Sequence, residues 1–188
     1  MGLHFQVNVS PAEWIVRSKT PEDLKITWGP EGFDAYARLR YIPDPLRPGQ
    51  DEADSMLPDD HMGDQAQARR TIQLLSSYTS TPDQVYFCWW DGDPDFDAPP
   101  ANPKVTLEHR SFALLCGRAA DVEAWPSTSD GSHPAFAWPE DRAWCFTSDV
   151  DPHWAGIAGS DEAISALVDD PQLDVVRASF GEAAPSYY

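Results

Sequence analysis

Alternation of apolar and polar positions predicts a half-buried strand in the first third of the chain. In FDAYARLRYI, Phe33 to Ile42, apolar side chains recur at every second position, and charged side chains stand between them: Asp34, Arg38 and Arg40. A period of two is typical of a strand that buries one face. Prolines at positions 43 and 45 then end the strand.

Two later segments are apolar on both faces and rich in aromatic residues. Gln84 to Trp90 and Ser111 to Cys116 therefore predict central strands that are covered on both sides. Lys104 to His109 alternates between them, which predicts a meander of three strands. We expect nine side chains of these and later elements in the core: Phe87, Trp89, Phe112, Leu114, Cys116, Trp144, Phe146, Ile164 and Leu167.

The last third of the chain predicts three more strands and a capped helix. PAFAWPEDRAWCF indicates a strand pair hinged at 139–141, and Leu173 to Ala178 a final strand. Ser160 precedes an amphipathic helix with two acids in its first turn, while 149–159 is expected to be a loop.

Helical periodicity is clearest within 64–78, where apolar residues recur at Ala68, Ile72 and Leu75. Shorter helices are expected near 11–17 and 119–125. Strands outnumber helices without regular alternation, which predicts the α+β class: a mainly antiparallel, twisted sheet of five to seven strands with two to four helices. We expect a single globular domain over 1–188, with a C-terminal tail at 181–188.

Residues 44–64 form the longest stretch without a periodic pattern. The segment combines prolines and glycines with six acids between Asp51 and Asp64. Only Met56 and Leu57 are expected to anchor it. We therefore expect an exposed loop that is the least ordered internal segment of the domain.

Charge and composition narrow the function classes. The 188 residues include 31 acidic and 13 basic side chains, for a formal charge of −18, which argues against a generic nucleic-acid binder. A hydrophobic content of 41% argues against a disordered acidic tail. An odd number of cysteines within apolar runs (Cys88, Cys116 and Cys145) indicates buried thiols in a reducing compartment. With no signal sequence or membrane span in the pattern, we expect a cytoplasmic protein without a membrane partner.

Two acidic segments are candidate sites. Asp91, Asp93, Asp95 and Asp97 alternate as at the start of a calcium loop, but Phe96 and Asn102 occupy positions that calcium loops give to Gly and Glu. A solvated acidic turn is the simpler interpretation. Asp149, Asp151 and His153 are spaced as a metal half-site, with a hydrogen-bonded turn as the alternative.

Glycines at 156 and 159 precede a helix, where phosphate can bind, but acids in the first turn would repel an anion. No nucleophile elbow, paired-cysteine motif, zinc-protease motif or phosphate loop occurs, and no cofactor is expected. Eight tryptophans are unusual in a small domain. Trp138, Trp144 and Trp154 cluster in one segment and are candidates for an interface or pocket, with the core as the alternative.

Four stretches resemble a family of uncharacterised actinobacterial cytoplasmic proteins. They are GFDAYARLRYIPDP, STPDQVYFCWWDG, HRSFALLCG and PAFAWPEDRAWCFTSDVDPHWAGIAGS, which lie in that order between Gly32 and Ser160. The resemblance implies a single bacterial cytoplasmic domain. It implies no activity and no site residue.

These observations favour a non-enzymatic acidic protein that binds a basic protein partner, of the immunity-protein or nucleic-acid-mimic type. Acid clusters at 51–64 and 91–97 are its expected contact regions. The alternative is a small-molecule or metal-dependent enzyme with a Trp-lined pocket near residues 144–154.

Overall fold

A computed structural model describes residues 2–93, 96, 99, 101–125 and 132–188. Within these residues the chain forms one sheet of nine strands and four α-helices, and every strand pair is antiparallel. The α+β class is thus confirmed, and the sheet has more strands than the predicted five to seven.

The helices and strands have the following bounds. The α-helices are α1 (Glu13–Val16), α2 (Glu22–Trp28), α3 (Asp64–Leu75) and α4 (Asp161–Val168). The strands are β1 (His4–Phe5), β2 (Ala35–Arg40), β3 (Val85–Trp90), β4 (Lys104–Thr106), β5 (Ser111–Gly117), β6 (Phe136–Pro139), β7 (Cys145–Thr147), β8 (Trp154–Gly159) and β9 (Val175–Ala178). Short 3₁₀ helices occur at η1 (Ser10–Ala12), η2 (Glu52–Asp54), η3 (Ser76–Tyr78) and η4 (Ala119–Ala124).

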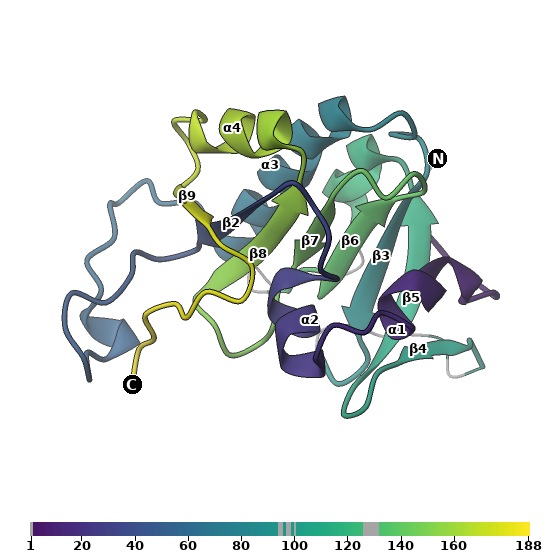
Figure 1. The fold of residues 1–188 in the computed structure, drawn as a ribbon, viewed down its shortest axis with the longest axis horizontal. Helices are drawn as coiled ribbons and strands as arrows, with labels where there is room; N and C mark the ends of the chain where they lie inside the picture. Colours follow the sequence, from purple (N-terminus) through teal and green to yellow (C-terminus); the bar gives the residue numbers. More distant parts are fainter. Residues whose placement is uncertain (1, 94–95, 97–98, 100, 126–131) are drawn as a thin grey trace.

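Helices cover both faces of the sheet, whose order is β1-β5-β3-β6-β7-β8-β2-β9, with β4 paired to β5 (Figure 1). One core lies between the sheet and α3, α4 and η4, and includes Ile72 and Ile164. A second core lies on the opposite face against α1 and α2, and includes Ile15 and Trp28. This three-layer arrangement explains why β3 and β5 are apolar on both faces.

The predicted core is confirmed, since all nine side chains are buried. The three cysteines are buried and unpaired. Burial raises the pKa of Cys88 and Cys145, and raises that of Cys116 to about 11. The α3 and α4 helices and the β6–β7 pair also agree with the prediction. Ser160 caps α4 as expected, because its hydroxyl accepts a hydrogen bond from the Ala163 amide.

Three local predictions are wrong. Residues 154–159 form β8, a fully buried interior strand, and not a loop. The three-strand meander fails because β5 lies between β3 and β4. Strand β2 is buried on both faces, with Tyr36 and Arg38 also inaccessible, because the unpredicted helix α2 builds a second layer on that side.

The loop at 44–64, called the arm below, runs out beyond β2 at the end of the molecule where the C-terminal segment also lies (Figure 1). Apart from η2 before α3 begins at Asp64, it has no regular structure. Met56 is 93% exposed and Leu57 39%, so neither anchors it as predicted. Buried Gln50 and partly buried Met62 lie nearer the body. No helix in the described part of the chain is long and apolar enough to cross a bilayer.

Candidate binding surface

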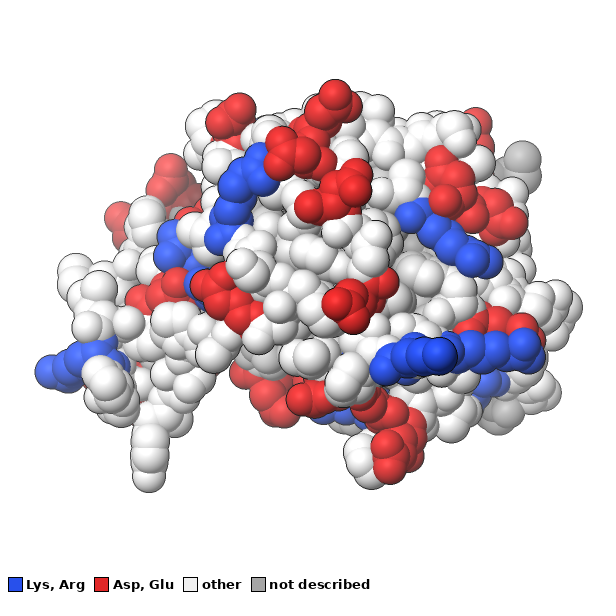
Figure 2. Space-filling model, in the orientation of Figure 1, with Lys and Arg blue, Asp and Glu red and all other residues white. Residues whose placement is uncertain are grey.

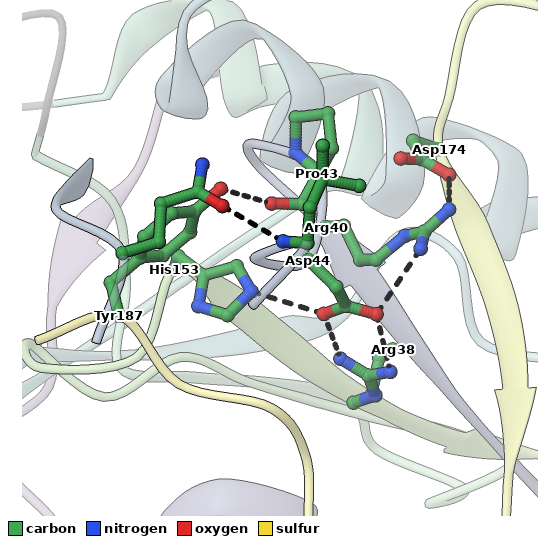
Figure 3. Close-up of polar contacts among 9 residues, drawn as sticks. Arg38, Arg40, Pro43, Asp44, His153, Asp174 and Tyr187 are labelled. Atoms are coloured by element: carbon green, nitrogen blue, oxygen red, sulfur yellow. Dashed lines mark hydrogen bonds and ion pairs between the residues drawn. The ribbon is translucent and has the colours of Figure 1, made fainter. Parts of the chain in front are cut away.

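The base of the arm is fixed by a cluster of charged side chains at the end of β2. Because Arg38 and Arg40 are two residues apart on the strand, both project from the same face. Asp44 accepts two hydrogen bonds from the Arg38 guanidinium, at 2.8 and 3.0 Å, and one from Arg40 at 3.1 Å (Figure 3). Arg40 also donates to Asp174 at 2.6 Å. These residues and His153 are called the anchor cluster.

His153 completes the anchor cluster from the segment that leads into β8. Its Nε2 lies 3.1 Å from the Asp44 carboxylate, and its side chain is only 4% exposed. Burial alone would raise the pKa of Asp44. Hydrogen bonds from Arg38 and His153, together with the arginine charges, instead hold that pKa well below its usual range. The Asp44 carboxylate is therefore ionised at neutral pH and binds the arm to the sheet.

The C-terminal segment fastens the arm from the other side. The Tyr187 hydroxyl donates to the Pro43 carbonyl at 2.6 Å, and its ring meets His153 edge-on, with centroids 4.9 Å apart (Figure 3). The Tyr188 amide donates to the Gln50 carbonyl at 3.0 Å. The last two residues of the predicted tail 181–188 are thus hydrogen-bonded to Pro43, which precedes the arm, and to Gln50 within it.

The remainder of the arm presents acidic and apolar side chains to solvent together. Glu52, Asp54, Asp59 and Asp60 are exposed, and no ion pair joins any of them to another described residue. Leu46 is 94% exposed and Met56 93%. The arm has one exposed arginine, Arg47, against these acids, whereas Lys and Arg lie among the carboxylates over much of the face seen in Figure 2. The arm is therefore the candidate binding surface.

A scan against protein-family models and searches of the curated proteins and of the solved structures found no match for this chain.

The described acids of the other predicted cluster, at 91–97, form contacts within the protein. Asp91 pairs with Lys104 at 2.5 Å and accepts a hydrogen bond from Ser111, so it joins two strands. Asp93 accepts hydrogen bonds from the Trp89 indole and the Ser132 hydroxyl. The predicted Asp95 and Asp97 lie outside the described residues. Asp91 and Asp93 are structural partners here and do not form a solvated acidic face.

The structure does not bring Asp149, Asp151 and His153 together. Asp149 forms an ion pair with Arg110, His153 faces Asp44, and the Asp151 side chain is 87% exposed. Among the residues that the structure describes, no group of three or more His, Cys, Asp or Glu side chains could hold a metal ion. The even spacing failed as a signal because Pro152 interrupts the extended chain.

The three candidate tryptophans are core residues. Trp138 is 1% exposed, Trp144 0% and Trp154 7%. Trp154 packs against Trp28 on one side and beneath the Arg38 guanidinium on the other. These indoles build the fold and do not offer surface anchors. The anchor cluster was not predicted from the sequence. Its one signal there was the pair of charged positions in β2 followed by Asp44.

Proposed function

We propose that this protein is a non-enzymatic acidic binding protein and that the arm is its contact surface for a basic protein partner. The observation that carries the proposal is the juxtaposition, on one projecting segment, of exposed Leu46 and Met56 with acids that form no ion pair with any described residue. Carboxylates accelerate encounter with a positive surface. Exposed apolar side chains supply contacts from which water is excluded when the partner binds.

The division of labour within the arm supports this role. Asp44 at the base of the arm is paired with Arg38 and Arg40, and this pairing holds the segment in place. The exposed acids farther along have no such partner in the described part of the chain, so their charge remains available to a second molecule. A fixed base reduces the conformational entropy that binding would otherwise have to remove.

The test compares two variants of equal charge. The arm variant carries Asp54→Asn, Asp59→Asn and Asp60→Asn, and the control variant carries Asp34→Asn, Asp83→Asn and Asp169→Asn, which are exposed acids elsewhere. A tagged chain is crosslinked in its native cells, and the captured partner is purified. We expect a basic partner whose association rate falls about tenfold in the arm variant and little in the control.

A second variant distinguishes effects on the association rate from effects on the dissociation rate. Met56→Ser together with Leu46→Ser should leave the association rate nearly unchanged and raise the dissociation rate, because apolar contacts form after encounter. A captured partner that is acidic, or association rates that respond equally to the arm and control variants, would overturn the proposal.

A further inference from the structure

A hollow of about 440 Å³ lies where the arm, the C-terminal segment and the start of β8 meet. This volume is within the range of about 300–1,000 Å³ that is typical of ligand sites. The hollow is lined by Glu52 of the arm, by 151–154, and by 184–188. It is thus a composite site whose walls come from three separate parts of the sequence.

The charges around the hollow leave it negative. In the anchor cluster behind it, Arg38 and Arg40 are balanced by Asp44 and Asp174. Glu52 and Asp151 line the hollow itself, and its described lining contains no Lys or Arg. Arg110 pairs with Asp149, and its guanidinium lies 4.0 Å from the Asp151 carboxylate. Within the described residues, Glu52 therefore lines the hollow without an ion-pair partner, and Asp151 has only this long contact with Arg110.

Aromatic and apolar groups form the rest of the wall. Tyr187 is held there by its hydrogen bond to Pro43 and its edge contact with His153, and Pro152 and Pro185 lie beside it. Burial raises the pKa of Tyr187, and the charges of Glu52 and Asp44 add to that rise, so the negative field reaches the phenol. Carboxylates beside a tyrosine ring are suited to an organic cation.

We propose that this hollow binds the guanidinium group of an arginine side chain from the basic partner. The inference rests on the proposed function and gives it a specific recognition element. Arginine suits the site better than lysine, because a planar guanidinium can lie against an aromatic ring while its N–H groups donate to two carboxylates. Lysine offers a single, strongly hydrated charge.

The probe for this proposal is N-acetyl-arginine amide, with N-acetyl-citrulline amide as its neutral counterpart of nearly the same shape. Titration into the ¹⁵N-labelled full chain is followed by NMR. With the arginine compound we expect saturable shifts confined to the backbone amides of Glu52 and of the non-proline residues within 151–154 and 184–188. N-acetyl-lysine amide should bind several-fold more weakly, and the citrulline compound should give no saturation.

Matched variants test whether the two carboxylates are responsible. Glu52→Gln with Asp151→Asn should weaken arginine binding at least tenfold, while Asp54→Asn, an exposed acid of the same 3₁₀ turn that does not line the hollow, should keep it within twofold. Both sites are exposed, so unchanged melting temperatures should verify that the fold is retained.

The outcomes separate this proposal from the proposed function. Absence of saturable shifts, or equal shifts with citrulline, overturns the arginine site even if the arm variant still slows association with the captured partner. Saturation that depends on Glu52 and Asp151 supports the site, even if the partner proves insensitive to the arm's other acids.

Discussion

At the scale of single residues, Asp44 holds several distant parts of the chain together, although the sequence around it gives little sign of this role. It lies just after β2 and accepts hydrogen bonds from Arg38 and Arg40 of that strand. Its carboxylate also contacts His153, which is distant in the sequence, and these contacts fix the base of the arm. Its partner Arg38 is only 7% exposed, so its charge depends on Asp44 for compensation. Removing one partner of such a pair costs more than the pair contributes, because the other charge stays buried.

Asp44→Asn should therefore lower the free energy of unfolding by about 3 kcal/mol, as is typical when one member of a buried ion pair is removed. Asp174→Asn is the control, since Asp174 is 41% exposed and pairs only with Arg40 among the described residues. It should cost no more than about 1 kcal/mol. Urea denaturation measures both changes, and equal costs would contradict the assigned role of Asp44.

The depressed pKa of Asp44 also predicts how stability depends on pH. The folded protein holds this carboxyl ionised below the pH at which the unfolded chain protonates it, at about 3.9. Its contribution is complete above that unfolded pKa and is lost as the pH falls toward the folded value. Below about pH 4 the free energy of unfolding should consequently fall more steeply for the wild type than for Asp44→Asn. Parallel acid profiles would contradict the prediction.

At the scale of elements, the contact of α2 with β8 decides the second layer of the fold. Gly156 allows this approach. A Cβ atom there would lie 2.0 Å from the Thr27 carbonyl oxygen and 2.7 Å from the Thr147 hydroxyl. That hydroxyl donates to the same Thr27 carbonyl at 2.8 Å. The glycine therefore serves close packing within a strand and does not serve a turn.

Gly156→Ala should force α2 away from the sheet and lower the free energy of unfolding by about 3 kcal/mol, at the upper end of overpacking effects. Gly2→Ala provides the control, because a methyl group at that position would meet no described atom within 4 Å. Thermal or urea unfolding compares the two. A well-tolerated Gly156→Ala would mean that α2 is not in direct contact with β8.

The C-terminal segment is the element that restrains the arm. Tyr187→Phe removes only the hydroxyl that donates to Pro43, a bond that contributes about 1 kcal/mol. Limited proteolysis by a glutamate-specific protease should cut the arm first, at Glu52, and about fivefold faster in this variant. Tyr188→Phe is a matched control, since the Tyr188 side chain is exposed and its backbone amide is retained. Equal cleavage rates for the two variants would argue against the restraint.

At the scale of the whole molecule, the charge of −18 opposes folding through self-repulsion. The attractive pairs near Arg38 are partly buried and are screened less than the exposed acids. Raising the ionic strength from about 0.01 to about 0.15 M shortens the screening length from about 30 to about 8 Å. The melting temperature should therefore rise over this range, and should rise less in the arm variant, which has three fewer negative charges. A fall in the melting temperature would show that attractive pairs dominate.

The sequence by itself determined the elements whose local pattern and final environment agree. β3 and β5 are apolar on both faces because core residues cover them on both sides, and α3 and α4 carry one apolar stripe because each covers one face of the sheet. For such segments, burial follows directly from side-chain chemistry. The resulting core list required no knowledge of which strands are neighbours.

Tertiary structure alone decided the features that depend on distant partners. Residues 154–159 contain two glycines and follow Pro152, which indicates a loop locally, but they form an interior strand because β7 and β2 hydrogen-bond on either side. Asp44 and Asp91 look alike as exposed acids in the sequence, yet each is neutralised by a partner, whereas Glu52 pairs with no cation in the described part of the chain. An isolated acid carries no signal of its counter-charge, since that partner is brought near only when the chain folds.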